Sequence, residues 1–423
     1  MTRAAQRSSR APIALSLLAI LMAYSACAGA FDATLGGVSF SLSGYGTLGA
    51  VHSSENQADF TASVFKPNGA GYTHAWSADV DSVLGAQVTA NFTPRLSAVL
   101  QVVAEQNADN SYSPHVEWAN IKYQFTSNFN VRIGRSVLPV FLASDDRKVA
   151  YANPWVRPPL EVYGLVPITG CDGVDVNYFF RTGEFKHTLQ GSYGNKEPQL
   201  TAAYGGGHST LKRNWSISDT IEDGALTVHL VYLAGNLTIS GLRPLFNGFR
   251  QFGPQGIAIA DRYEVDNTPL SFMGLGASYD PGNWFVMGEG GTTAYHPLLG
   301  NKTAGYISGG YRVGEFTPYI TYARAKADHL SDPGLTVSAV PLLLSEAATT
   351  LNNALNSVLR TKPVQNTISI GVRWDFMKNT DFKMQFDHIA IGAGSTGVLL
   401  NTQPGFQPGG KVDVVSLTVD FVF

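Results

Sequence analysis

The densest group of chemically active side chains in the sequence lies between residues 138 and 172. Its charged residues are Asp145, Asp146, Arg147, Lys148, Arg157, Glu161 and Asp172. Acids and bases at this spacing can set up a local electric field. They can also be the solvated surface of an ordinary loop, with half of the charges pointing outward. The adjacent acids Asp145 and Asp146 do not amount to a calcium site, because calcium takes roughly six or more oxygen ligands.

No other grouping predicts catalysis or cofactor binding. Residues 44–49 (GYGTLG) match the dinucleotide fingerprint G-x-G-x-x-G, but that motif must open a helix and this segment lies within a strand-like stretch. These glycines are better explained as relief of crowding where the first and last strands meet. The nine histidines lack metal-ligand spacing, and His208 beside Ser209 is the closest approach to a base and a nucleophile. The sequence therefore predicts no cofactor, no metal and no enzyme.

The first thirty residues have the three parts of a secretory signal peptide. Arg3, Arg7 and Arg10 precede the apolar run 13–22 (IALSLLAILM), and residues 28–30 (AGA) offer a cleavage site. The apolar run is too short to span a bilayer as a helix. We therefore predict that residues 1–30 are a signal peptide and that residues 31–423 form one exported domain.

The cysteines and the charge limit what the mature chain can be. Acylation of Cys27 is the competing interpretation of the signal, but the residues before it lack the aliphatic side chain that lipoprotein signals favour. After cleavage only Cys171 remains, so an intramolecular disulfide is impossible. Loss of three arginines moves the formal charge from −3 to −6. With no basic run, the sequence predicts no nucleic-acid partner.

The rest of the chain alternates apolar and polar residues in short segments. In residues 412–423 (VDVVSLTVDFVF), positions 415, 417, 419, 421 and 423 share an apolar face, and the chain ends on Phe423. Residues 366–377 and 381–392 repeat the pattern. A period of two is that of a β-strand with one apolar and one polar face.

Sixteen such segments occur, and their connections alternate between short and long. The segments are residues 38–52, 75–92, 95–106, 115–125, 129–137, 173–181, 185–194, 213–222, 225–239, 270–280, 284–294, 304–313, 316–327, 366–377, 381–392 and 412–423. The short connections are rich in Gly, Asn, Asp and Pro, as tight turns require. Among the long ones, residues 341–360 have helical periodicity and residues 245–259 are a weaker helix candidate.

This pattern predicts an all-β fold, a 16-stranded antiparallel transmembrane β-barrel. Sixteen strands in one sheet have no second layer to bury their apolar faces, whereas lipid can cover them around a wet interior. No segment after the signal approaches the roughly eighteen consecutive apolar residues of a membrane helix. An even strand number with short turns on one side places both chain ends in the periplasm and the long loops outside the cell.

Three segments resemble the general trimeric porins of Gram-negative outer membranes. They are residues 81–105 (DSVLGAQVTANFTPRLSAVLQVVAE), residues 173–194 (GVDVNYFFRTGEFKHTLQGSYG) and the terminal Phe423. The resemblance implies an outer-membrane channel for passive diffusion of small hydrophilic solutes and ions, assembled as a homotrimer. It also implies contact with outer-membrane lipid and lipopolysaccharide, and insertion by the barrel-assembly machinery through the strand that ends at Phe423.

In that family the third extracellular loop folds into the barrel and narrows it. Residues 138–172 occupy this place here, so the resemblance implies a pore constriction that includes Asp145, Asp146, Arg147, Arg157 and Glu161. Strand alternation points four bases into the lumen: Lys122, Arg132, Arg373 and Lys383. Acids and bases on opposite sides of a narrow pore make a transverse field that orients dipolar solutes and filters ions.

Two other functions stay open. The connections 240–269 and 328–365 are longer than general porins usually carry. If either contains another hairpin, the chain is a substrate-selective channel with eighteen strands. If the helical segment 341–360 is presented at the cell surface, the barrel could instead be a receptor or adhesin. The sequence alone identifies neither the transported solute nor the ion preference.

Overall fold

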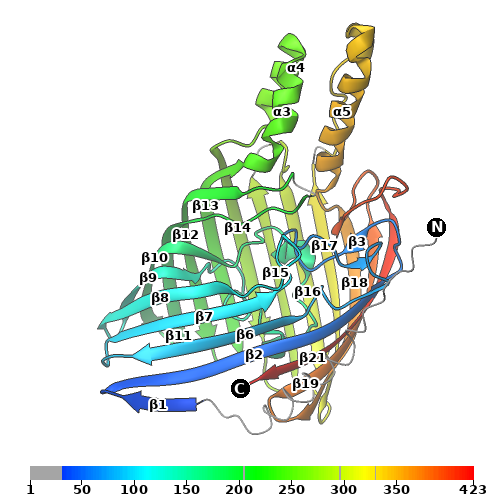
Figure 1. The fold of residues 1–423 in the computed structure, drawn as a ribbon. Helices are drawn as coiled ribbons and strands as arrows, with labels where there is room; N and C mark the ends of the chain where they lie inside the picture. The colour runs from blue at the N-terminus through cyan, green and yellow to red at the C-terminus, as the bar shows by residue number, and fades with distance from the viewer. Residues whose placement is uncertain (1–30, 203–204, 295–296, 329) are drawn as a thin grey trace, which may run out of the picture.

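Sixteen long antiparallel strands form a closed barrel in the part of the chain that the structure describes. This computed structural model describes residues 31–202, 205–294, 297–328 and 330–423. The barrel strands are β2 (Val38–Ser53), β6 (Val83–Asn91), β7 (Leu96–Glu105), β8 (His115–Thr126), β9 (Phe129–Val137), β10 (Gly170–Thr182), β11 (Phe185–Lys196), β12 (Ser209–Asp223), β13 (Leu226–Ile239), β14 (Thr268–Tyr279), β15 (Trp284–Ala294), β16 (Lys302–Tyr311), β17 (Phe316–Ala327), β18 (Gln365–Met377), β19 (Thr380–Ile391) and β21 (Gly410–Val422). Each strand pairs with its neighbours along the chain, and β21 pairs with β2 to complete the ring (Figure 1). The prediction of a sixteen-stranded barrel is confirmed.

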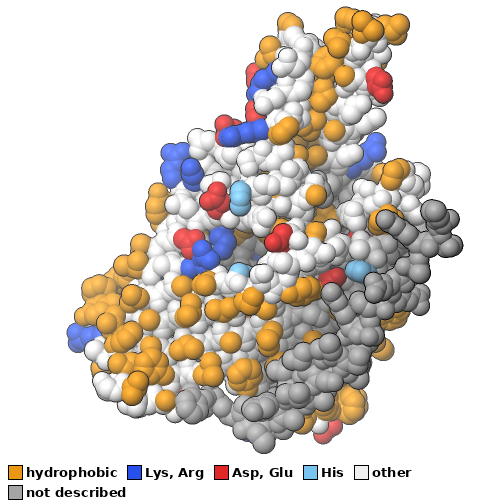
Figure 2. Space-filling view, viewed as in Figure 1, with side chains coloured by type: hydrophobic (Ala, Val, Ile, Leu, Met, Phe, Trp, Pro, Cys, Tyr) orange, Lys and Arg blue, Asp and Glu red, His pale blue; other side chains and the backbone are white. Residues whose placement is uncertain are grey.

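The barrel wall has an apolar outer face and a largely polar inner face. In β18, Ile368 and Ile370 are exposed on the outside, whereas Thr367 and Ser369 are buried toward the interior. Hydrophobic side chains gather over the lower strands in Figure 2, and charged side chains lie mainly above them. An apolar outer band around a polar interior is the arrangement that a bilayer requires of a barrel.

The seam between the last strand and the first explains two of the glycines in residues 44–49. The amide of Gly44 donates to the carbonyl oxygen of Phe423, and the amide of Phe423 donates to that of Gly44, each at 3.0 Å. A Cβ on Gly44 would stand 2.2 Å from the Phe423 ring, and one on Gly46 would stand 2.4 Å from the Phe421 ring. Glycine at both positions therefore lets the terminal aromatic rings pack directly on the backbone of β2. This agrees with the prediction that these glycines relieve crowding where the first and last strands meet.

Two details of the first strands differ from the prediction. The expected strand at residues 75–92 divides into β5 (Trp76–Ser77) and β6, because residues 78–82 form a turn in which the Ser77 hydroxyl accepts a hydrogen bond from the Asp79 amide. A short strand that the pattern did not indicate, β1 (Phe31–Leu35), pairs with the start of β2. Gly36 and Gly37, both with positive φ, make the turn between them.

The short turns and long loops lie at opposite ends of the barrel, and the long loops contain additional elements. These are β3 (Asp59–Phe60), β4 (Ala70–Gly71), η1 (Ala150–Ala152), α2 (Leu160–Tyr163), η3 (Ser240–Leu242), α3 (Arg243–Arg250), α4 (Gly253–Tyr263), η4 (Val337–Ala339), η5 (Leu342–Leu344), α5 (Ser345–Arg360) and β20 (Leu399–Leu400). Both predicted loop helices are therefore present. The eighteen-stranded alternative is wrong for the described residues, because the loops that could have held a further hairpin form α3, α4 and α5 instead.

Helices α3, α4 and α5 rise from the barrel mouth and share one apolar core (Figure 1). Phe246 and Phe249 of α3 are buried against Leu355 and Leu359 of α5. In the described residues, no helix is long and apolar enough to cross a membrane. The predicted signal peptide, residues 1–30, lies outside the residues that the structure describes.

Candidate functional site

The connection between β9 and β10, residues 138–169, folds into the barrel and is called the third loop below. Within it, η1 contacts β2 and β21, and α2 contacts β15, β16 and β17. These strands lie across the ring from β9 and β10, which carry the two ends of the loop. The third loop therefore crosses the interior and lies against the opposite wall.

An apolar core holds the third loop against that wall. Phe141 of the loop meets Phe272 of β14 with ring centroids 5.6 Å apart, and Trp155 meets Tyr306 of β16 at 5.5 Å. Both pairs are edge-to-face, which is a favourable arrangement of aromatic rings. The Trp155 indole also donates to the hydroxyl of Ser308 at 2.9 Å. This part of the interior is packed like the core of a soluble protein.

A buried carboxylate of the wall also binds the loop. Glu289 of β15 accepts hydrogen bonds from the Tyr163 hydroxyl at 2.6 Å, the Tyr306 hydroxyl at 2.8 Å and the Leu142 amide at 2.8 Å. Two of the three donors belong to the third loop. Glu289 therefore joins two segments of the third loop, at Leu142 and Tyr163, to the barrel wall.

Arg157 is the most strongly held cation of the loop. Its guanidinium bonds both carboxylate oxygens of Asp81, at 2.8 and 2.6 Å, and also reaches Asp387 at 3.3 Å. The Ser416 hydroxyl accepts a further bond at 2.6 Å. Because Arg157 is only 7% exposed, it fastens the loop to the wall around the seam and presents little charge to the lumen.

Glu161 and Arg147 are also enclosed by the protein. Glu161 accepts hydrogen bonds from Gln365 and Thr367 of β18, and burial raises the pKa of its carboxyl. Arg147 donates to the backbone carbonyls of Val166, at 2.9 Å, and Tyr163, at 2.7 Å. Burial lowers the pKa of Arg147 to about 10. Both residues stabilise the path of the loop.

Two of the four wall bases lie beneath the loop. Lys383 is fully buried and donates to the carbonyl of Ala150 at 2.6 Å, with Asp420 at 3.0 Å. Arg373 donates to the carbonyl of Tyr151 at 2.5 Å and pairs with Asp381 at 3.1 Å. The alternation places both side chains inside the barrel, as predicted. Their positive charge meets η1 and its carbonyl groups, however, and not an open lumen.

The other two wall bases lie on the side that the loop leaves open. Lys122 is exposed, and no ion pair or hydrogen bond of its side chain occurs among the described residues. Arg132, opposite it in register on β9, bonds Asp175 at 2.6 Å. Asp145 and Asp146 of the loop are exposed as well. Although the surrounding protein raises the pKa of both carboxyls, Arg132 lies near enough to Asp145 to oppose that rise.

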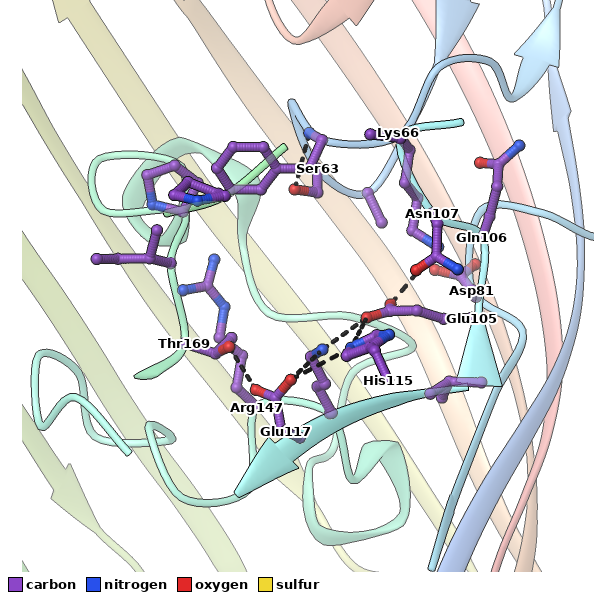
Figure 3. Close-up of a pocket in the computed structure, with 18 of the residues that line it drawn as sticks. Ser63, Lys66, Asp81, Glu105, Gln106, Asn107, His115, Glu117, Arg147 and Thr169 are labelled. Atoms are coloured by element: carbon purple, nitrogen blue, oxygen red, sulfur yellow. Dashed lines mark hydrogen bonds and ion pairs between the residues drawn. The ribbon is translucent and has the colours of Figure 1, made fainter. Parts of the chain in front are cut away.

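A cavity of about 570 Å³ lies among the connections that follow β2, β7, β9 and β11, beside the ends of β7 and β8. Lys148 reaches from the third loop to Glu105 at 2.6 Å and Glu117 at 2.9 Å. His115 stands 3.5 Å from Glu117, and Figure 3 shows Glu105, His115 and Glu117 facing one another. Burial alone would lower the pKa of Lys148, but the two carboxylates outweigh it and raise that pKa.

Eight carboxylates that complete these contacts were not predicted as site residues. They are Asp81, Glu105, Glu117, Asp175, Glu289, Asp381, Asp387 and Asp420. Strand alternation could have placed most of them inside the barrel. It could not have distinguished an acid that binds the third loop from one that faces water. Within the described residues, no group of three or more His, Cys, Asp or Glu side chains could hold a metal ion.

Comparison with known proteins gives similarity in structure and none in sequence. No protein-family model and no curated protein matches the sequence. The fold is similar to that of OmpF from Salmonella typhi, solved in complex with daunomycin, with a TM-score of 0.55 and 11% identity over 93% of this chain and 100% of that one. It is also similar to the outer membrane channel DcaP of Acinetobacter baumannii, with a TM-score of 0.54 and 12% identity over 94% of this chain and 100% of that one.

A third similar structure is an anion-selective porin from Comamonas acidovorans. Its TM-score is 0.52, with 13% identity over 91% of this chain and 100% of that one. At these identities the comparisons establish a shared barrel fold. The solute and the ion preference of the present chain must be argued from its own side chains.

Proposed function

We propose that the protein is an outer-membrane porin, a channel for passive diffusion of small hydrophilic solutes and ions. The observation that carries the proposal is the open side of the interior, where Lys122 and Arg132 are neighbours on the polar wall and Arg132 acts electrostatically on the exposed Asp145 of the third loop. The apolar outer band and the barrel fold shared with OmpF and DcaP support it.

The constriction of this channel is the gap between those acids and bases. The charges in the gap differ in how far they are neutralised. Arg132 is paired with Asp175, whereas Lys122, Asp145 and Asp146 remain exposed. The transverse field predicted from the sequence is thus supplied by four residues, and Arg157, Arg373 and Lys383 support the loop instead.

Recording in planar lipid bilayers tests the channel directly. Purified folded protein should produce stepwise increases in conductance, and the same preparation unfolded by heating should produce none. Repeated absence of steps from folded protein would refute the proposal.

Assembly as a homotrimer is part of the proposal, and the outer surface supports it. The outward positions of β2, β6 and β7 carry the accessible alanines Ala50, Ala86, Ala98 and Ala104 between larger side chains such as Leu48 and Leu84. Small residues allow close packing between protein surfaces in a membrane. The mass of the particle in mild detergent tests this, and a monomer would exclude the trimer.

Export and membrane insertion complete the proposal. We expect cleavage after Ala30, so that the mature chain begins at Phe31, and recognition of the terminal strand by the barrel-assembly machinery. Amino-terminal sequencing of the membrane-inserted protein checks the first expectation. Removal of Phe423 should reduce the amount of assembled barrel, because its ring packs on Gly44 at the seam. Normal assembly of the shortened chain would contradict the second.

A second candidate function, as a receptor or adhesin, is favoured by α3, α4 and α5. They are joined by specific contacts: the Tyr263 hydroxyl donates to Asp332 at 2.7 Å, and Asn352 exchanges hydrogen bonds with the backbone of Leu335. Short linkers in place of residues 243–263 and 345–360 should leave the conductance intact. Loss of surface adherence by cells carrying this variant would support the receptor role, and unchanged adherence would exclude it.

A further inference from the structure

The cavity beside the ends of β7 and β8 has no role in the constriction proposed above. Its volume of about 570 Å³ lies within the range of about 300–1,000 Å³ that is usual for small-molecule sites. The third loop lines it with Lys148, which is two residues from Asp146 in the chain. The cavity therefore adjoins the acids of the proposed constriction, and a solute that approaches them can first be held there.

Most of the charged side chains that line the cavity are already paired within the protein. Lys148 bonds Glu105 at 2.6 Å and Glu117 at 2.9 Å. The Lys66 ammonium lies 3.8 Å from Glu105, and His115 stands within 3.8 Å of both acids. Three further bases of the lining bond carboxylates or backbone carbonyls: Arg135, Arg147 and Arg157. An ionic solute would therefore lose its water without gaining a free counter-charge.

The charges that remain give the lining no single sign. They are Lys196, Glu197 and Asp109, one base and two acids. Lys196 and Glu197 are consecutive in the chain, and both acids are exposed to solvent. Asp81, the other acid of the lining, is bonded by Arg157. The cavity thus lacks the group of free bases that would select an anion and the group of free acids that would select a cation.

Lys148 and Glu105 offer a spare hydrogen-bond donor beside a spare acceptor. An ammonium group has three donors, and a carboxylate has about four acceptor positions. Among the described residues, Lys148 uses two donors and Glu105 accepts one hydrogen bond. Both side chains remain 20% exposed. Because a hydroxyl group donates and accepts at the same time, one hydroxyl of a solute can bind both of them.

One aromatic ring adds an apolar surface to this polar lining. Phe65, in the connection after β2, is partly buried against the core that α3, α4 and α5 share, and it also lines the cavity. Tyr163, the other aromatic residue of the lining, is buried. A sugar ring presents C–H groups between its hydroxyls, and these groups can pack on an aromatic face. Phe65 is therefore the ring that a sugar in the cavity can reach.

From these observations we infer that the cavity binds a neutral, polyhydroxylated solute of the saccharide class, with Lys148 and Glu105 on its hydroxyls and Phe65 against its C–H groups. The inference rests on the proposed function, because it names a class of solute that the channel would admit. A neutral solute suits this lining because it needs no counter-charge, while each of its hydroxyls can use the donors and acceptors that the paired charges leave free.

The test compares three sugars that differ in charge at one position. Glucose is the neutral probe, glucuronate carries a carboxylate at C6, and protonated glucosamine carries an ammonium group at C2. Binding to the full-length protein is measured by saturation-transfer NMR in a detergent without a sugar headgroup. Glucose should bind, and each charged sugar should bind at least about ten-fold more weakly, because it loses hydration without gaining a free counter-charge.

A variant places the sugar in the cavity. F65L keeps an apolar side chain against the core of α3, α4 and α5 but removes the aromatic face. It should weaken glucose binding by roughly three- to ten-fold, the contribution of one aromatic contact. The matched control is F252L, since Phe252 is also partly buried against that core but does not line the cavity. Its affinity for glucose should stay within about two-fold of that of the unmodified protein.

Three outcomes would overturn the inference. They are equal binding of the three sugars, unchanged glucose binding by F65L, and tighter binding of glucuronate, which would assign the cavity to anions at Lys196. Conductance of every form is recorded in parallel in planar bilayers. A protein that conducts but binds no glucose would overturn the inference and leave the channel intact. A protein that binds glucose but never conducts would refute the channel and leave the binding site to stand separately.

Discussion

The two halves of the barrel interior have the same strand pattern and opposite character. Along β14 to β19 the inner wall meets the third loop, and side chains such as Phe272 and Lys383 are fully buried. Along β8 to β11 the inner wall keeps Lys122 exposed and Arg132 partly exposed. An inward position therefore becomes a core position or a channel position according to whether the loop covers it.

The comparison separates charges that hold the structure from charges that act on solutes. Arg157 and Lys383 are buried with acids, and the partly buried Arg373 pairs with the buried Asp381. Loss of these bases would leave acids unpaired in a region of low polarity. Lys122, Asp145 and Asp146 are exposed, so their loss would change the field in the gap with little effect on folding. Variants on the side that the third loop covers should therefore lose stability, whereas variants on the open side should change ion selectivity.

The largest effect is expected from R157Q. The substitution leaves Asp81 and Asp387 buried without their cation, which should cost about 3–5 kcal/mol. We expect lower stability to urea, together with larger and noisier conductance steps because the loop is released from the wall. The matched control is R312Q, since Arg312 also bonds both oxygens of one acid, Asp280, at 2.7 Å, but on the exposed surface. Its loss should cost about 1 kcal/mol or less. If R157Q and R312Q lowered the stability equally, Arg157 would not be a charge that holds the structure.

A smaller effect on the covered side is expected from Y163F. The change removes only the hydroxyl that donates to Glu289 at 2.6 Å, and loss of a buried bond to a charged group costs about 1.5–3 kcal/mol. The free energy of unfolding in urea measures this cost. Y322F is the control, because the Tyr322 hydroxyl donates to Asn366 on the exposed outer surface. If Y163F were as stable as Y322F, Glu289 would not be an anchor of the loop.

Much of the barrel could be predicted from the sequence because its strands obey local rules. The period of two and the tight turns are properties of neighbouring residues, and they placed sixteen strands in order. The break at residues 78–82 escaped because Val80 and Val83 continue the apolar pattern while a Ser77 side chain bends the chain. Residues 341–360 were recognisable as a helix for the same local reason.

The arrangement of the site depends on contacts that cross the lumen and could not be predicted. Arg157 is separated from Asp81 by 76 residues and from Asp387 by 230. Alternation places each of these acids inside the barrel, but it does not say which of them the loop will reach. For this reason five of the loop charges were expected at the constriction, whereas only Asp145 and Asp146 among those five lie exposed on its open side.

On the open side, D145N/D146N should reduce the preference of the channel for cations at neutral pH. In the unmodified protein the ion preference should also depend on pH, and the variant should lose this dependence. Because the surrounding protein partly desolvates both carboxyls and raises their pKa, they take up protons at a higher pH than fully solvated aspartates, whose pKa is about 4. Acidification should therefore neutralise them early and lower the cation preference, as measured by reversal potentials in a salt gradient. A variant that kept the full pH dependence would show that other groups control it.

The smallest and most local effect is expected from K122Q. Lys122 lies opposite Arg132 on β9 and Ser97 on β7, and its exposed side chain makes no contact that folding needs. The stability should change by about 0.5 kcal/mol or less, whereas the reversal potential should move toward cations because one positive charge leaves the gap. K411Q is the matched control, since Lys411 is exposed on the outside of β21. An unchanged reversal potential in K122Q, or an equal shift in K411Q, would mean that the solute path does not run along β8, and the constriction would have to be sought on the covered side.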